Sequence, residues 1–164
     1  MAYEELIKRY EAGGGRLAQA RAEGVAVPPS LQTVVLTCMD SRINTYTLFG
    51  LNLGEVHVLR NAGGVVTDDV IRSLTISQRK LGTRDILVIQ HAGCGLGTFT
   101  DDEFRENLRN ETGMKPPWSP ESFSDLDAEV RNSLNRIRNS AFIQHKNARG
   151  FVYDVDTGRL REVT

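Results

Sequence analysis

Side chains that bind soft metal ions occur at two separate points of the sequence. Cys38 follows the apolar run 33–37, and His91 and Cys94 follow a second apolar run at 86–90. Thiolate and imidazole are ligands that suit Zn²⁺, and three protein ligands leave a fourth position for water or another ligand. These residues therefore predict a catalytic zinc site with one ion per chain.

Two simpler interpretations of the same residues stay open at this point. Two buried cysteines can pack as small hydrophobic side chains beside an unrelated histidine. The glycines around Cys94, at 93, 95 and 97, also suggest a dinucleotide loop. That loop lacks the full G-x-G-x-x-G spacing and leaves Cys94 unexplained. The His-x-x-Cys spacing, directly after a predicted strand, favours the metal site.

Asp40 and Arg42 follow Cys38 closely enough to act on the same metal. Asp40 is expected to serve as a conditional fourth ligand, and Arg42 is a natural bidentate partner for its carboxylate. Bound to the metal, Asp40 would close the site. Paired with Arg42, it would leave the position to a water molecule whose pKa falls to about 7 on zinc. The alternative is an ordinary surface ion pair or a helix N-cap. We expect both residues to be catalytic.

Apolar patterns divide the chain into alternating strands and helices. Strands are predicted at 33–38, 55–60, 86–90 and 150–155, with a last one at 159–163, and helices at 43–49, 66–81, 100–112 and 124–139. This order predicts an α/β fold, with a mostly parallel central sheet of about four strands, helices on both faces and a short C-terminal antiparallel strand. In such sheets ligands bind beyond the carboxyl ends of the strands, where Cys38, His91 and the turn at 61–64 converge.

Length and composition fit one domain, residues 1–164, in a cytoplasmic protein. Residues 3–24 show an amphipathic helix pair broken by glycines at 13–15, which predicts an N-terminal helical arm over 1–27. The formal net charge of −1 gives no electrostatic reason to expect a nucleic acid or an anionic membrane. The apolar runs are too short for a membrane span, and no targeting segment is visible.

The combined pattern Cys38-x-Asp40-x-Arg42 and His91-x-x-Cys94 resembles the signature of the β-class carbonic anhydrases, in their compact bacterial and archaeal form. The segments 60–64 and 150–160 also resemble parts of that family, so the resemblance covers nearly the whole chain. It implies reversible hydration of CO₂ to bicarbonate and a proton, by attack of zinc-bound hydroxide on CO₂ in a small apolar pocket. It also implies zinc bound by Cys38, His91 and Cys94.

The same resemblance implies roles for further residues. Asp40, released by Arg42, would accept a hydrogen bond from the hydroxide. Asn52 stands near the position where some members carry a glutamine that helps to position substrate, and Gly63 and Gly64 are assigned to substrate binding with it.

The resemblance further implies homodimers, or multiples of dimers, with the active-site cleft at the subunit interface. The arm 1–27 is the element expected to embrace the partner. Two other functions stay open. One is hydrolysis of CS₂ or COS on the same zinc site. The other is a non-catalytic zinc domain, closed permanently by Asp40.

Overall fold

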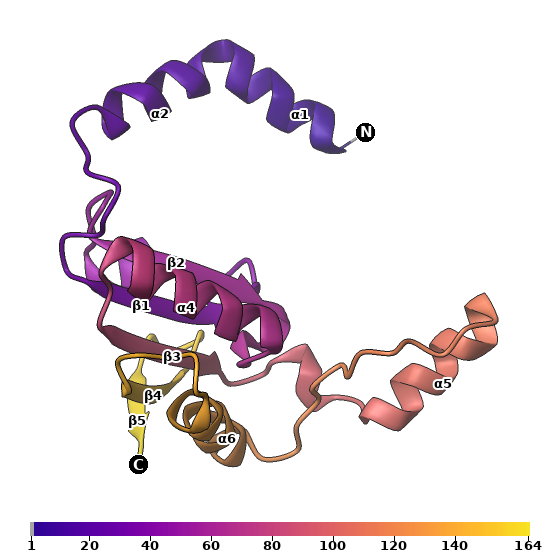
Figure 1. Ribbon diagram of the computed structural model, residues 1–164. Helices are drawn as coiled ribbons and strands as arrows, with labels where there is room; N and C mark the ends of the chain where they lie inside the picture. The colour runs from indigo at the N-terminus through magenta and orange to yellow at the C-terminus, as the bar shows by residue number, and fades with distance from the viewer. Residues whose placement is uncertain (1) are drawn as a thin grey trace.

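The structure, a computed structural model, describes residues 2–164 and is built around one mixed sheet (Figure 1). Its strands are β1 (Thr33–Cys38), β2 (Val56–Asn61), β3 (Asp85–His91), β4 (Asn147–Tyr153) and β5 (Leu160–Val163). They lie in the order β2-β1-β3-β4-β5, with β1 to β4 parallel and β5 antiparallel to β4. The predicted α/β architecture is confirmed, including its short antiparallel strand.

The helices are those expected from the apolar patterns, but three of them begin two residues later. They are α1 (Ala2–Arg9), α2 (Gly15–Ala22), α3 (Thr45–Phe49), α4 (Asp68–Leu81), α5 (Asp101–Thr112) and α6 (Leu126–Asn139). The delay arises because Asn44, Thr67 and Asp125 cap α3, α4 and α6 through their side chains instead of joining the helix. A capping box of Thr100 and Glu103 begins α5.

The main core lies between the sheet and the two helices α4 and α6 (Figure 1). Leu36 of β1 and Val88 of β3 are fully buried against Leu74 of α4 and Leu134 of α6. Alternate strand residues share this face, because successive side chains of a strand point to opposite sides. The connection between the parallel strands β1 and β2 carries the short helix α3.

β4 starts and ends earlier than the sequence pattern indicates. It runs over Asn147–Tyr153, whereas the apolar run favours 150–155. Its first residues alternate between exposed and buried positions. Because the exposed ones, Asn147 and Arg149, are polar, the beginning of the strand has no apolar run in the sequence. The strand ends at Tyr153 because the Asp154 carboxylate accepts hydrogen bonds from the backbone N–H groups of Asp156 and Thr157, which form a turn.

Helices α1 and α2 form an arm that extends away from the sheet (Figure 1). The chain kinks between them at Gly13, where φ is +124°, a value that favours glycine. The predicted helix pair with a glycine break is therefore confirmed. The arm presents a row of apolar side chains that are more than half exposed: Tyr3, Leu6, Ile7, Tyr10 and Leu17.

Candidate metal centre

The carboxyl ends of β1 and β3 bring Cys38, His91 and Cys94 together. Their potential ligand atoms all lie within 4.8 Å of one another, and all three side chains are buried. The parallel register explains the meeting. Thr37 pairs with Ile89, so Cys38 and His91, one and two residues further along their strands, lie at the same edge of the sheet. Two thiols and one imidazole form a donor set that fits Zn²⁺.

The turn after β3 presents His91 and Cys94 to the same point. Gly93 lies between them with φ at +67°, in the left-handed region that glycine adopts without a steric penalty. The N–H of Ala92 donates to the carbonyl of Tyr153 at 3.0 Å, which anchors this turn to β4. The turn thus directs the two candidate ligands of the His-x-x-Cys motif to the same point.

The hydrogen bond of His91 selects the ring nitrogen that is free to bind a metal. Nδ1 lies 3.0 Å from the carbonyl oxygen of Ala92, which can only accept, so Nδ1 carries the proton. Nε2 is buried and has no hydrogen-bond partner in the described part of the chain, 2–164. An orphaned, buried lone pair beside two thiols is what a metal ligand requires.

The surroundings of the thiols favour one thiolate even without a metal. Burial raises the pKa of Cys38, but the neighbouring His91 ring and the backbone N–H groups of Asp40 and Gly63 outweigh it and hold that pKa at about 7. Burial raises the pKa of Cys94, against a hydrogen bond from the N–H of Leu96. The pKa of His91 is raised, chiefly by its contact with Cys38. Thus Cys38 is the thiol that ionises first.

Asp40 is paired with Arg42 and is not a member of the metal-ligand cluster. Nε and Nη2 of Arg42 donate to the two carboxylate oxygens at 3.0 and 2.6 Å, and the Arg42 N–H donates at 2.9 Å. These bonds hold the pKa of Asp40 far below its usual range. The Oδ2 atom still lies only 3.8 Å from Nε2 of His91. Asp40 therefore rests at the edge of the cluster with its charge fixed.

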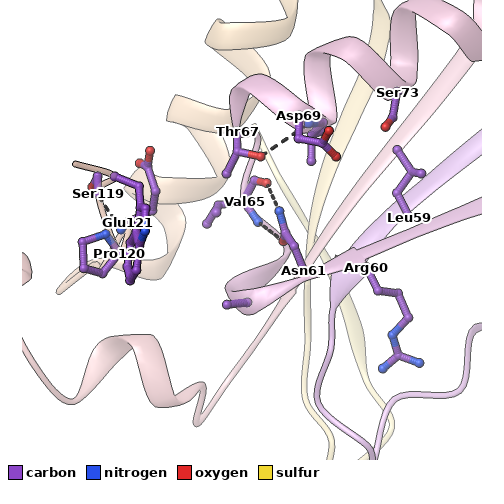
Figure 2. Close-up of a pocket in the computed structure, with 13 residues that line it drawn as sticks. Leu59, Arg60, Asn61, Val65, Thr67, Asp69, Ser73, Ser119, Pro120 and Glu121 are labelled. Carbon is purple, nitrogen blue, oxygen red and sulfur yellow. Dashed lines mark hydrogen bonds between the residues drawn. The ribbon is translucent and has the colours of Figure 1, made fainter. Parts of the chain in front are cut away.

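The turn after β2 supports Cys38 through its backbone. Asn61 fixes the turn by exchanging two hydrogen bonds with Val65, at 2.8 and 3.1 Å (Figure 2). This places the Gly63 N–H on the Cys38 sulfur. The backbone of Gly64 packs so closely on β1 that an added Cβ would lie 2.8 Å from the Cys38 nitrogen. Both glycines thus lie beside the cluster.

Asn52 is not brought to the cluster within one chain. It precedes β2, and its N–H and side-chain amide donate to the Glu55 carboxylate at 2.7 and 3.2 Å. The cluster lies at the other end of β2, where Asn61 pairs with Cys38.

A cavity of about 330 Å³ adjoins the turn that carries Asn61, but on the side of α4 (Figure 2). Thr67, Asp69 and Ser119 are among the residues that line it, and the three candidate metal ligands are not. The cavity is therefore separate from the metal centre.

Comparison with known proteins places this site in a family. The carbonic anhydrase family model matches residues 33–115, the segment that contains every candidate ligand. β-Carbonic anhydrase 1 of Mycobacterium tuberculosis is 54% identical over 84% of this chain and 85% of its own.

The chain belongs to the β-carbonic anhydrase family.

Two further relatives of this β-carbonic anhydrase family member bear on fold and substrate. The crystal structure of carbonic anhydrase from Streptococcus mutans superposes with a TM-score of 0.90 at 39% identity, covering 100% of this chain and 98% of its own. A carbon disulfide hydrolase of Saccharolobus solfataricus is 41% identical over 97% of this chain and 87% of its own. The fold is thus that of the family, in which proteins of two named activities occur.

Apolar side chains surround the thiols in this family member. Ile43 is buried against the two cysteines, and Leu96, Phe123 and Tyr153 pack on the same cluster. Such a wall excludes water from one side of the metal centre and strengthens electrostatic interactions inside it.

Some supporting groups of this β-carbonic anhydrase site were not predicted from the sequence. Arg60 and the backbone groups of Ala92 and Leu96 contact the ligand residues, although they carry no metal-binding chemistry of their own. The signal for Arg60 is the register of two parallel strands, because β2 ends beside β1 at Cys38 and Asn61. Backbone contacts leave no such trace in residue types.

Proposed function

We propose that this chain catalyses the reversible hydration of CO₂ to bicarbonate and a proton, with Zn²⁺ held by Cys38, His91 and Cys94. The observation that carries the proposal is a buried Cys₂His donor set whose neighbouring carboxylate, Asp40, is held by Arg42. Three ligands leave a coordination position for chemistry, as in catalytic zinc sites. When bound there, Zn²⁺ lowers the pKa of a water molecule to about 7 and so makes hydroxide available near neutral pH.

Asp40 and Arg42 orient the reacting group in this proposal. The Asp40 carboxylate is ionised and can only accept hydrogen bonds, so it favours an occupant that donates one. Arg42 fixes both carboxylate oxygens, which limits the rotation of the acceptor. A small apolar molecule such as CO₂ is then expected against Ile43, Leu96 and Phe123. The proton leaves toward solvent on the side of Arg42, which is exposed.

Residues of a second copy complete the site in this proposal. The exposed apolar row of α1 and α2 supports a homodimer, or a multiple of dimers, embraced by the arm 1–27. Asn52 can then approach the centre only from the partner, while Gly63 and Gly64 border the substrate within one chain. We place the protein in the cytoplasm, where reducing conditions keep both ligand cysteines as thiols. In the described part of the chain no helix is long and apolar enough to cross a membrane.

A CO₂ hydration assay, with zinc content measured on the same sample, tests the proposal. We expect one zinc per chain and hydration that rises from about pH 7 to 9 as water on the metal ionises. A sample that holds one zinc per chain but shows no hydration over this range would overturn it.

A second activity, hydrolysis of CS₂ or COS, is favoured by one observation. The Saccharolobus solfataricus relative named carbon disulfide hydrolase shares 41% identity over nearly the whole chain. Both substrates are linear like CO₂, so the ligand set does not separate them. Release of H₂S from CS₂ or COS by the zinc-loaded protein, without CO₂ hydration, would favour this activity over the first.

A further inference from the structure

Arg60, the penultimate residue of β2, holds the backbone on both sides of Met39. Its Nε donates to the carbonyl of Cys38 at 2.9 Å, and its Nη2 donates to the carbonyl of Asp40 at 2.6 Å. The side chain is exposed, yet both acceptors are backbone carbonyls rather than carboxylates. One guanidinium therefore binds the backbone of Cys38, a candidate metal ligand, and that of Asp40, which lies beside the candidate ligands.

Neighbouring hydrogen bonds hold the same short segment. The N–H of Met39 donates to the carbonyl of Asn61 at 2.8 Å, and the N–H of Ile43 donates to the carbonyl of Asp40 at 3.1 Å. The Asp40 carbonyl thus accepts from Arg60 and Ile43 together. With its backbone tied, Asp40 can move its carboxylate only by side-chain rotation.

Arginine is suited to this position by its planar fork of donors. The two carbonyls belong to residues two apart, and they are reached by two different nitrogens of one rigid group. A lysine ammonium is a single point of donation and cannot reproduce both bonds with the same geometry. Arg60 is one of the residues that line the neighbouring cavity, but its side chain extends away from Thr67 and Asp69 at the start of α4 (Figure 2).

We propose that Arg60 is a positioning residue of the metal centre, whose guanidinium holds the carbonyls of Cys38 and Asp40 and thereby fixes the Cys38 thiolate and the pivot of the Asp40 carboxylate. The inference rests on the proposed zinc site. Without Arg60, the carbonyls of Cys38 and Asp40 lose their side-chain hydrogen bonds, and backbone pairing with β2 alone holds this segment. The Cys38 sulfur is then fixed less firmly at the point shared with His91 and Cys94. The metal is then held less tightly.

Arg60→Met and Arg60→Lys test this role, with Arg79→Met as the matched control. Arg79 is also exposed and also donates two hydrogen bonds to a backbone carbonyl, that of Phe142, at 3.3 and 3.1 Å, but it stands on α4. Each full-length variant is titrated with Zn²⁺ against a chromophoric chelator. The visible absorption of the Co²⁺-substituted protein is recorded as a report on ligand geometry, and thermal unfolding of the metal-free protein reports on stability.

We expect Arg60→Met to weaken zinc binding about 10- to 100-fold, the usual loss when a support of a ligand is removed. Its Co²⁺ bands should shift, whereas Arg79→Met should bind zinc within about twofold of the parent and keep the parental spectrum. Arg60→Lys should fall between, and it serves if Arg60→Met does not fold.

Parental zinc affinity and Co²⁺ spectrum in folded Arg60→Met, or in Arg60→Lys if only that variant folds, would overturn the inference. Equal losses in Arg60→Met and Arg79→Met would also overturn it, because the effect would then be one of general stability. If the parent itself binds no zinc, the proposed function fails, and that result is distinct from parental binding in the variants.

Discussion

The Oδ2 atom of Asp40 lies 3.8 Å from Nε2 of His91 while it accepts a 2.6 Å hydrogen bond from Arg42. This carboxylate oxygen is close enough to the candidate ligands for two alternatives to be considered. It can bind the metal and close the site, or it can accept hydrogen bonds from Arg42 and stay outside it. The described state is the second, and Arg42 supplies the bonds that maintain it. In the proposed mechanism, the balance between these two states depends on the ion pair of Asp40 and Arg42.

Replacing Arg42 by alanine should release Asp40 toward the metal. We expect zinc to stay bound at one ion per chain, while CO₂ hydration at pH 7 falls about 10- to 100-fold because the carboxylate occupies the open position. Zinc content and hydration rate are measured on the same preparation.

The matched control for that variant is Arg149→Ala. Arg149 pairs with both oxygens of Glu162 at 2.7 and 2.6 Å, but on β4 and β5 away from the metal centre. It should retain its hydration rate within about twofold, as expected of an exposed pair. Full activity of Arg42→Ala at neutral pH would rule out the switch.

Replacing His91 by alanine should remove zinc and activity together, since Nε2 is the buried, unshared nitrogen of the cluster. The loss of hydration should exceed about 100-fold, more than the loss of a group that merely supports a ligand. His145→Ala is the control, because this histidine lies outside the cluster. Stoichiometric zinc in His91→Ala would show that the ligand assignment is wrong.

Zinc affinity should fall as the pH is lowered, and the slope should become steeper below about pH 7. Above pH 7 Cys38 is mostly thiolate, so zinc displaces chiefly the proton of Cys94, whose pKa is raised. Below pH 7 the proton of Cys38 must be displaced as well, and His91 also competes because its pKa is raised. The logarithm of the affinity should change by about one per pH unit above pH 7 and by two or more below it. A constant slope from pH 6 to 8.5 would contradict these pKa directions.

Removing zinc with a chelator should lower stability without unfolding the chain. The main core of Leu36, Leu74 and Val88 lies in a different cluster from Cys38 and Cys94. Excess zinc at 1,000 times Kd contributes about 4 kcal/mol, which corresponds to a rise in Tm of roughly 10 °C. Circular dichroism of the chelated protein should keep its native signal at 25 °C. Unfolding on chelation would support the closed zinc domain instead.

Substituting Gly64 by alanine should destabilise the protein more than the same change at Gly82. Both residues have positive φ, +65° and +74°, and each substitution should cost about 1–2 kcal/mol for the left-handed backbone. At Gly64 the new Cβ would also lie 2.8 Å from backbone atoms of Thr37 and Cys38, whereas nothing lies within 4 Å at Gly82. The collision should add about 1–3 kcal/mol, measured by urea unfolding of the metal-free proteins. Equal losses would show that the turn relaxes freely.

The order of elements and the meeting of the ligands were predictable because each has a local signal. The apolar runs at 33–37 and 86–90 determine two adjacent buried strands, and parallel pairing then brings their carboxyl ends to one edge. The candidate ligand residues Cys38, His91 and Cys94 follow these runs closely. Nothing beyond spacing and strand direction was needed to expect them together.

Strand limits and supporting contacts were less predictable because they depend on register. The polar start of β4 at Asn147 becomes a strand only through its pairing with Asp85 of β3. From the sequence alone Arg60 is an ordinary surface charge. Its contact with Cys38 becomes evident only when β2 is paired with β1. The resting state of Asp40 is a choice between two local partners, and only side-chain geometry decides it.

The root of the arm meets the body where Val25 packs on Gly54, and a Cβ at that glycine would collide with the valine. Beyond this point, residues 2–22, which comprise α1, α2 and the helical segment between them, measure about 30 Å along the chain at 1.5 Å per residue. A rotation of about 10° at the root would displace the tip by about 5 Å, roughly the pitch of a helical turn. The contact of Val25 with Gly54 therefore sets the direction in which the arm leaves the sheet. A substitution at Gly54 is therefore expected to change the direction of the arm relative to the sheet, with every residue of α1 and α2 unchanged.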